Sequence, residues 1–344
     1  MIKTFLLLLC AGFLSVMTAQ DSGENSGKFS GLTFGDYYYV MKNHDKSIKD
    51  QHGFWLRRIY FTYDYTVDED WSARFRLEMR NAGDFKSNSP ITPVIKDAWL
   101  RYKFLNQSVY LGISGTPTFA LIEDTWGYRS VEKVPVDLYK MGSSKDFGIA
   151  LKGKIDQKGI FNYHAMYSNG NGIKYEIDKG KAGMLAFSVQ LKNGLIFEAY
   201  GDYADQPNHT DTYILQGFIA YKAEKFRIGV QYTNQWIQQT NADKRDLRIL
   251  SGFVTSDISN CFSLLLRGDR SFDANPKADG IDFIPFDPTV KFTLIIFGID
   301  FHPVKNVKII PNIEFAKYNK NSVGIPPDDD LFAESIDLCI VHLF

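Results

Sequence analysis

The stretch WSARFRLEMR (residues 71–80) decides the fold, because its apolar and charged residues alternate one by one. Trp71 and Phe75 fall on one side of the alternation, and Arg74 and Glu78 fall on the other. Successive side chains of a strand point to opposite faces, whereas the helical repeat of about 3.6 residues would mix the two sets. The stretch therefore predicts a β-strand with one apolar face and one charged face.

The same alternation recurs along the chain after about residue 30. We expect sixteen strands, at 31–40, 54–66, 71–80, 97–104, 108–114, 147–154, 160–168, 184–192, 196–203, 213–222, 226–236, 247–256, 261–270, 291–302, 307–318 and 333–344. Most are close to ten residues long, which is the usual length of a strand that crosses an outer membrane.

The connections between these strands alternate between short and long. The short ones are rich in Asn, Asp, Gly and Pro, as hairpin turns require. The long ones lie near 42–53, 81–93, 115–146, 169–183, 204–212, 237–246, 271–290 and 319–332. Short turns at one end and long loops at the other are typical of outer-membrane barrels. We therefore predict an all-β fold, a 16-stranded antiparallel transmembrane β-barrel over residues 31–344, with the third long loop, 115–146, folded inward.

The two ends of the chain carry signals of export. Residues 1–19 have a basic start, an apolar run and a small-residue close, which predicts a signal peptide, followed by a flexible segment over 20–30. The last strand alternates apolar residues up to Phe344, which resembles the assembly signal of outer-membrane barrels. The net charge of −1 gives no argument for a nucleic-acid partner.

The barrel hypothesis assigns the two faces of each strand. Trp71 and Phe75 should meet lipid, because a charge on the lipid side at mid-depth costs about 2–4 kcal/mol. In 54–66, Arg57 shares the outward face with Ile59, and Arg58 falls on the inward face. The predicted pore-lining and selectivity residues are Arg58, Arg74, Arg76, Glu78, Arg80, Asp97, Arg101, Arg129, Lys133 and Lys140.

Arg227, Arg248 and Arg267 on later strands extend this inward set. Rings of basic side chains favour anions, so the set as a whole suggests a weak anion preference. The alternative is that these charges pair with one another and make the wall rigid. The residue pattern leaves both interpretations open.

Several stretches together resemble the phosphate-selective porin O and P family. They are FWLRRIYFTYDYTVDEDWSARFRLEM, KDAWLRYKF, YRSVEKVP, SSKDFGIALKGK, LRGDRSFD and FGIDFHPVKNVKIIPNIEFAKY. The resemblance covers about residues 30–344 and implies a sixteen-stranded, trimeric porin. The compact turns and aromatic-rich strands suggest a Bacteroidetes-like Gram-negative source. Phosphate selectivity is not carried over, because the charges within the third long loop balance.

The predicted function is a water-filled porin of a Gram-negative outer membrane, which crosses it many times and passes small hydrophilic solutes and ions. The alternatives are a substrate-specific channel or a binding barrel for carbohydrate or phosphate, and then an outer-membrane enzyme, for which the chain shows no catalytic motif. The six histidines have no metal-ligand spacing, so we expect no metal and no cofactor. Expected partners are the outer-membrane lipid and lipopolysaccharide and, from the resemblance, two further copies of the chain.

Overall fold

The strands form one closed antiparallel ring. The computed structural model describes residues 26–240, 242–319, 327–334 and 338–341. Its strands are β1 (Ser26–Lys42), β2 (His52–Thr66), β3 (Trp71–Arg80), β4 (Thr92–Phe104), β5 (Gln107–Gly115), β6 (Lys145–Lys154), β7 (Phe161–Ser168), β8 (Ala182–Gln190), β9 (Leu195–Ala204), β10 (Thr212–Lys222), β11 (Phe226–Gln239), β12 (Ala242–Asp257), β13 (Phe262–Ser271), β14 (Phe292–Val304), β15 (Val307–Ile309), β16 (Asn312–Tyr318), β17 (Asp330–Glu334) and β18 (Leu338–Val341).

These strand segments make sixteen crossings. β15 and β16 both pair with β14 and are separated at Pro311, whose nitrogen carries no hydrogen to donate to a ladder. β17 and β18 both pair with β1, so the last crossing closes the ring on the first. In the described part of the chain, every crossing thus has a paired neighbour on each side, which leaves no free edge there. The predicted fold class is confirmed.

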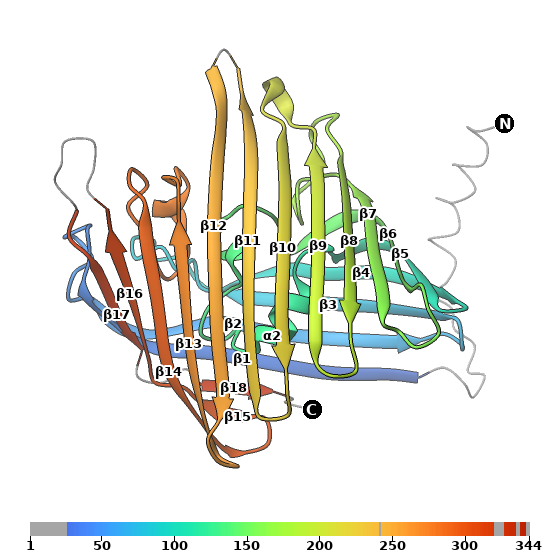
Figure 1. Cartoon of the computed structure of the whole chain (residues 1–344), viewed down its shortest axis with the longest axis horizontal. Coiled ribbons are helices and arrows are strands. Elements are labelled where there is room, and N and C mark those ends of the chain that lie inside the picture. The colour runs from blue at the N-terminus through green and yellow to red at the C-terminus, as the bar shows by residue number, and fades with distance from the viewer. Residues whose placement is uncertain (1–25, 241, 320–326, 335–337, 342–344) are drawn as a thin grey trace.

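Short turns and long loops lie at opposite ends of the barrel, as Figure 1 shows for the turns that follow β10 and β12 at the bottom. One predicted loop is wrong. Residues 237–246 belong mostly to β11 and β12, which continue as an extended hairpin above the rest of the wall. The polar residues there pair through their backbone, which needs no apolar side chain. β1 likewise begins at Ser26, before the predicted start at residue 31. The signal peptide and Phe344 lie outside the described residues.

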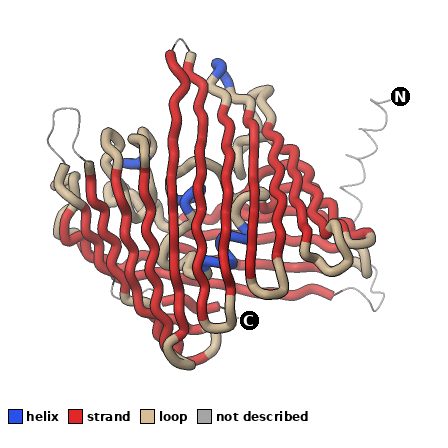
Figure 2. The backbone as a smooth tube through the Cα atoms, in the orientation of Figure 1, coloured by secondary structure: helices blue, strands red, loops and turns tan. Residues whose placement is uncertain are grey.

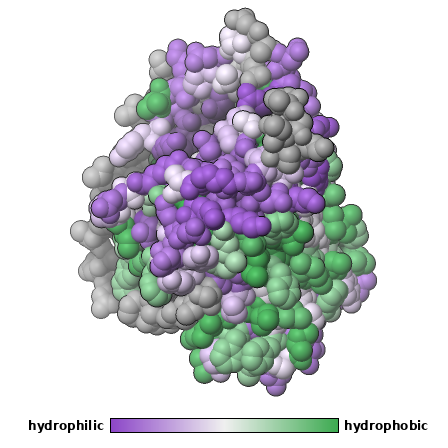
Figure 3. Space-filling model, turned by 90° about the vertical axis from the view of Figure 1, so that its left-hand side faces the viewer, coloured by the Kyte–Doolittle hydropathy of each residue, from purple (hydrophilic) through white to green (hydrophobic). Residues whose placement is uncertain are grey.

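The two faces of the wall differ as the alternation predicts. Phe75 is 40% exposed on the outer face, whereas Glu78 is 1% exposed on the inner face. On β14, Ile295 and Phe297 are exposed and Leu294 is buried. Figure 3 shows the hydrophobic side chains gathered below a hydrophilic upper region. Among the described residues, no helix combines the length and apolar character needed to cross a membrane.

Two β-bulges interrupt this alternation and turn additional charges inward. Between β1 and β2, Phe34 pairs with Arg58 but Asp36 pairs with Trp55, so two residues of β2 face Gly35. Both arginines of β2, Arg57 and Arg58, are consequently buried on the inner side. Gly35 is required there, because a Cβ would collide with the carbonyl oxygen of Trp55. The predicted outward position of Arg57 is wrong for this reason.

The second bulge lies in β4. Arg76 pairs with Asp97 and Leu77 pairs with Ile95, which leaves Lys96 as the additional residue. Lys96 Nζ lies 3.1 Å from a carboxylate oxygen of Glu78, on the inner side next to Asp97. Strict alternation would have placed Lys96 in the lipid.

Replacing Phe75 by arginine is expected to destabilise the barrel by about 2–4 kcal/mol, because the charge would face lipid near mid-depth. Replacing Phe75 by leucine, which keeps an apolar side chain at the same outward position, is the matched control, with a loss well below that range. Urea unfolding of protein refolded in lipid vesicles measures both. Equal losses for the two variants would contradict the assignment of the faces.

Candidate functional site

The loop between β5 and β6 lies inside the barrel and carries two short helices, α2 (Ala120–Trp126) and α3 (Pro135–Leu138). Helix α2 ends at Gly127, whose φ of 74° is in the left-handed region that glycine favours. The apolar side chains of the loop, among them Ile122, Trp126 and Leu138, join one buried cluster with inward residues of β10, β12, β13 and β14. Figure 2 shows these helices within the ring of strands. The loop therefore packs against β10 and β12 to β14 and narrows the lumen.

Two arginines from the wall hold the tip of this loop. Arg57 Nη1 donates to the carbonyl of Val131 (2.8 Å), and Arg267 Nη1 donates to the carbonyl of Lys133 (2.5 Å). The indole of Trp126 donates to the intervening carbonyl of Glu132 (3.0 Å). Three consecutive carbonyls are thus satisfied in a buried setting, which fixes the path of the loop.

Arg57 is also the centre of a buried ionic cluster. Its guanidinium contacts carboxylates of Asp36 and Glu334, and its Nη1 lies 3.5 Å from Glu132. The side chain of Arg57 is only 6% exposed. A buried charge is stable only when it is paired and hydrogen-bonded, so these contacts are mutually dependent.

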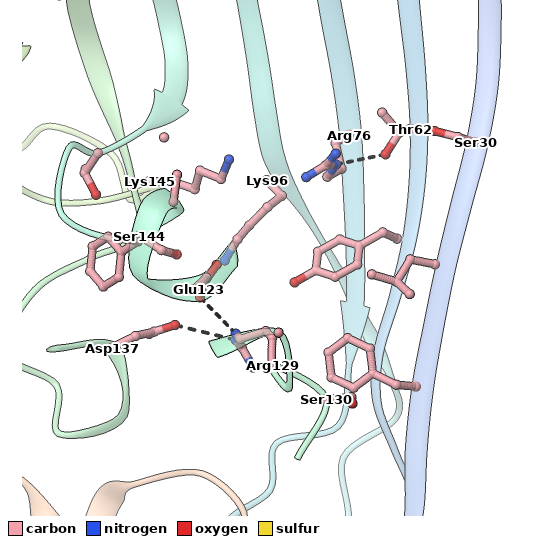
Figure 4. A pocket seen from close by; sticks show the side chains of 18 of the residues that line it. Ser30, Thr62, Arg76, Lys96, Glu123, Arg129, Ser130, Asp137, Ser144 and Lys145 are labelled. Carbon is pink, nitrogen blue, oxygen red and sulfur yellow. Dashed lines mark hydrogen bonds and ion pairs between the residues drawn. The ribbon is translucent and has the colours of Figure 1, made fainter. Parts of the chain in front are cut away.

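A cavity of about 530 Å³ lies between the loop and the wall formed by β1 to β6. Two acidic side chains line it, Glu123 and Asp137, both from the loop. Six basic side chains also line it, namely Arg76, Lys96, Arg129, Lys145, Lys152 and Lys308. In Figure 4, Lys96 extends from the wall towards Glu123 of the loop, and Arg76 lies on the wall beside Thr62, to which it donates at 2.8 Å. The lining therefore carries an excess of positive charge.

Ion pairs reduce this excess only in part. Arg129 Nε lies 3.2 Å from Glu123, and its Nη2 lies 3.5 Å from Asp137. Asp97, behind the lining, is shared by Lys145 (2.5 Å) and Arg76 (3.3 Å). One carboxylate therefore serves two cations.

Lys152 has no carboxylate within ion-pair distance among the residues that the structure describes, and its Nζ lies 5.1 Å from the centre of the Tyr110 ring. Lys308 Nζ reaches Asp300 at 3.0 Å. The lining itself thus holds more basic than acidic side chains, while Glu78, Asp97 and Asp300 pair with some of the basic ones from behind it.

Burial changes the protonation of the loop carboxyls in different directions. Burial raises the pKa of Glu123, and the attraction of Arg129 offsets only part of this effect. Burial also acts to raise the pKa of Asp137, but Lys133 and Arg129 together hold the pKa of that carboxyl below its ordinary value. Glu123 therefore loses its charge more readily than Asp137, and the lining becomes more positive on acidification.

A second cavity, of about 610 Å³, lies on the other side of the loop, against β8 to β11. Its basic lining residues are Lys140, Lys174, Arg245 and Lys277, and its acidic ones are Asp146 and Asp202. Burial lowers the pKa of Lys277, and repulsion by Lys140, Arg245 and Lys174 lowers it further. The other three cations are therefore close enough to Lys277 to repel it.

The ten predicted pore-lining residues fall into distinct groups. Arg76 and Arg129 line the first cavity, and Lys140 lines the second. Arg74 is held by Asp64 at 2.6 Å, and Lys133 lies 3.5 Å from Asp282. Neither Arg74 nor Lys133 lines a cavity, and the remaining five predicted residues also lie outside both. Arg58 and Arg80 lie near Glu78, Asp97 lies next to Arg76, and Arg101 is half-buried on β4.

The sequence misplaces one basic residue of the wall and misses three others. Arg248 was expected to face inward, but its neighbours Leu247 and Ile249 are buried and Arg248 lies on the outer face, paired with Asp273 at 2.8 Å. The prediction also missed Lys96, Lys152 and Lys308. Lys152 follows the alternation of its strand and could have been found, whereas the inward position of Lys96 depends on the bulge.

Among the described residues, no group of three or more histidine, cysteine, aspartate or glutamate side chains is placed to hold a metal ion.

Comparison with known proteins supports the architecture only through structure. No family model matches the chain, and no curated protein matches it in sequence. OmpT of Vibrio cholerae is similar in structure, with a TM-score of 0.64 at 15% identity over 94% of this chain and 99% of that one.

The anion-selective porin from Comamonas acidovorans has a TM-score of 0.65 at 12% identity, over 92% and 100% of the two chains. The outer-membrane channel DcaP of Acinetobacter baumannii has a TM-score of 0.66 at 11% identity, over 94% and 99%. The chain therefore has the sixteen-stranded barrel fold of the outer-membrane porins of Gram-negative bacteria.

Proposed function

We propose that this protein is a porin of the Gram-negative outer membrane that lets small hydrophilic solutes diffuse passively, with a preference for anions. The observation that carries the proposal is the lining of the first cavity, in which six basic side chains face two acidic ones. A sixteen-stranded barrel is wide enough to leave an aqueous passage, and the inward loop narrows it on one side. Selection then follows from size and from the charge of the wall.

Two structurally similar proteins are named as an anion-selective porin and as an outer-membrane channel, which agrees with this proposal. Transport by diffusion needs no catalytic group, so the protein acts as a channel and not as an enzyme. The chain's resemblance to the phosphate-selective porin O and P family supports a trimer as the working assembly. One OmpT structure is described as a trimer form.

Reconstitution in a planar lipid bilayer tests the proposal. We expect ohmic current steps and, under a salt gradient, a reversal potential whose sign marks a higher permeability for anions. The preference should grow as the salt is diluted, because screening of the wall charges weakens. Folded protein that inserts but gives no steps, or steps with cation preference at low salt, would contradict the proposal.

The second cavity favours one alternative, a channel specific for a multivalent anion. Four basic side chains gather there from separate loops and strands, which is an arrangement suited to several negative charges on one solute. In that case a polyphosphate or a tricarboxylate should block the current at micromolar concentration. Monovalent anions such as chloride should pass without block.

A further inference from the structure

Three basic residues lie at the outer face of the wall, near the end that carries the long loops. On β13, Leu264 and Leu266 are exposed while Leu265 is buried, so the pleat places Arg270 on the outer face as well. On β16, Ile313 is exposed on the outer face and Lys317 shares its side. Lys291 is exposed directly before β14. These positions should meet lipid, not the lumen.

Backbone register brings the three residues together around one threonine. Thr293 of β14 pairs with Arg270 on one side and with Lys317 on the other. Side chains directly opposite each other across a sheet have Cβ atoms about 4.5–5.5 Å apart. Arg270 Nη1 donates to the Thr293 hydroxyl (2.7 Å) and to the side-chain oxygen of Asn319 (3.0 Å). Lys291 precedes Thr293 by two residues, and the backbone carbonyl of Lys291 accepts from the backbone N–H of Asn319 (2.9 Å).

No acidic partner neutralises this group. Within the part of the chain that the structure describes, none of the three basic side chains has a carboxylate at ion-pair distance. Arg248, on the same face, differs in this respect because Asp273 holds it in two hydrogen bonds of 2.8 Å. The three cations therefore keep their charge for a partner outside the barrel wall.

Apolar side chains continue directly below them towards the middle of the membrane. Ile295, Phe297 and Ile299 follow Thr293 on the outer face of β14 and are 43%, 46% and 39% exposed. Leu266 lies beside them on β13 and is 44% exposed. Cations on a lipid-facing strand are tolerated near the interface, where their cost falls to about 0–1 kcal/mol. The column thus changes from apolar to cationic where acyl chains meet headgroups.

We propose that Arg270, Lys291 and Lys317 bind the phosphorylated headgroup of an outer-leaflet lipid, whose acyl chains lie along the apolar column of β14. Arginine and lysine both recognise phosphate oxygens, and the Thr293 hydroxyl supplies a further polar contact. The occupant is a lipid and not free phosphate, because the cations and the apolar column form one continuous surface. The site faces away from the lumen, so it is independent of the proposed channel.

Native mass spectrometry of the full, detergent-purified protein with added lipid A, which carries phosphates and several acyl chains, tests the site. The variant R270Q/K291Q/K317Q should bind lipid A at least about tenfold more weakly, because each basic residue near a lipid surface increases the affinity roughly fivefold. The control K158Q/K192Q/K225Q removes the same charge from exposed lysines at the short-turn end and should bind as the natural protein does.

A charge-preserving variant and two further ligands test the same assignment. The charge-preserving variant R270K/K291R/K317R should retain lipid A. The single-channel conductance of R270Q/K291Q/K317Q should stay unchanged. Equal binding of dephosphorylated lipid A, or displacement of lipid A by inorganic phosphate alone, would overturn the assignment to a phosphorylated lipid. Dissociation of R270Q/K291Q/K317Q into monomers that still bind lipid A would overturn it as well, because this face would then be a contact between copies of the chain.

Discussion

Replacing Arg57 by alanine is expected to destabilise the barrel by about 3–5 kcal/mol, which is the usual loss when one partner is removed from a buried ion pair. The guanidinium contacts Asp36, Glu132 and Glu334, and its loss leaves buried negative charges facing one another. It also frees the carbonyl of Val131, which is one of the anchors of the inward loop.

Urea unfolding in lipid vesicles measures the stability of the R57A variant, and single-channel recording measures the position of the loop. We expect a larger and noisier conductance, because the loop tip loses one of its two arginine anchors and keeps the one on Arg267. Arg57→Lys should lie between the natural protein and R57A, since lysine keeps the charge but cannot make all the contacts of the planar fork.

The matched control for this prediction is Arg80→Ala on β3. The side chain of Arg80 is 42% exposed, and its contacts to Glu78 and Asp282 are long, at 3.9 and 3.8 Å. Exposed ion pairs contribute about 0–1 kcal/mol, so the R80A variant should unfold close to the natural protein. Similar losses for R57A and R80A would show that the buried cluster does not hold the loop.

Neutralising three cations of the first cavity is expected to remove most of the anion preference. The variant R76Q/K96Q/K152Q leaves three basic side chains against two acidic ones in the lining. One charge at about 4 Å in water is worth about 1 kcal/mol, so the permeability ratio of anion to cation should fall about fivefold for each charge at low salt. Reversal potentials under a salt gradient give this ratio directly.

The structure indicates that this variant still folds. Glu78 keeps Arg58 at 3.4 Å, and Asp97 keeps Lys145 at 2.5 Å, so neither buried carboxylate loses every partner. K158Q/K192Q/K225Q again serves as the control of equal charge, because these lysines lie outside both cavities. An unchanged ratio in R76Q/K96Q/K152Q would mean that ions do not pass through the first cavity.

Much of the barrel could be predicted because a strand between lipid and water alternates apolar and polar residues. The stretch 71–80 was assigned with the bounds that β3 has in the structure, and its inner and outer faces agree as well. The number of crossings followed in the same way. The predicted loop at 237–246 failed, because a hairpin that projects beyond the membrane has no apolar face to mark it.

The candidate site was less predictable, since it depends on contacts between distant segments. Arg76 and Arg129 were chosen from the sequence and line the same cavity, although they come from β3 and from the inward loop. Lys308 belongs to the last third of the chain, and no local pattern links it to them. The hydrogen bonds from Arg57 and Arg267 to the loop carbonyls of Val131 and Lys133 likewise depend on where the loop lies in the barrel.

The amino-acid sequence by itself determined the strands, their two faces and the closed barrel, because lipid on one side and water on the other impose a period of two on every crossing. Only the tertiary structure decided which charges meet in the lumen. Two bulges turn Arg57 and Lys96 inward against that period, and the path of the third loop selects the part of the wall that stays open. Bulges and loop paths are set by pairing register and by packing between remote segments. The sequence has no periodic pattern that marks either of them.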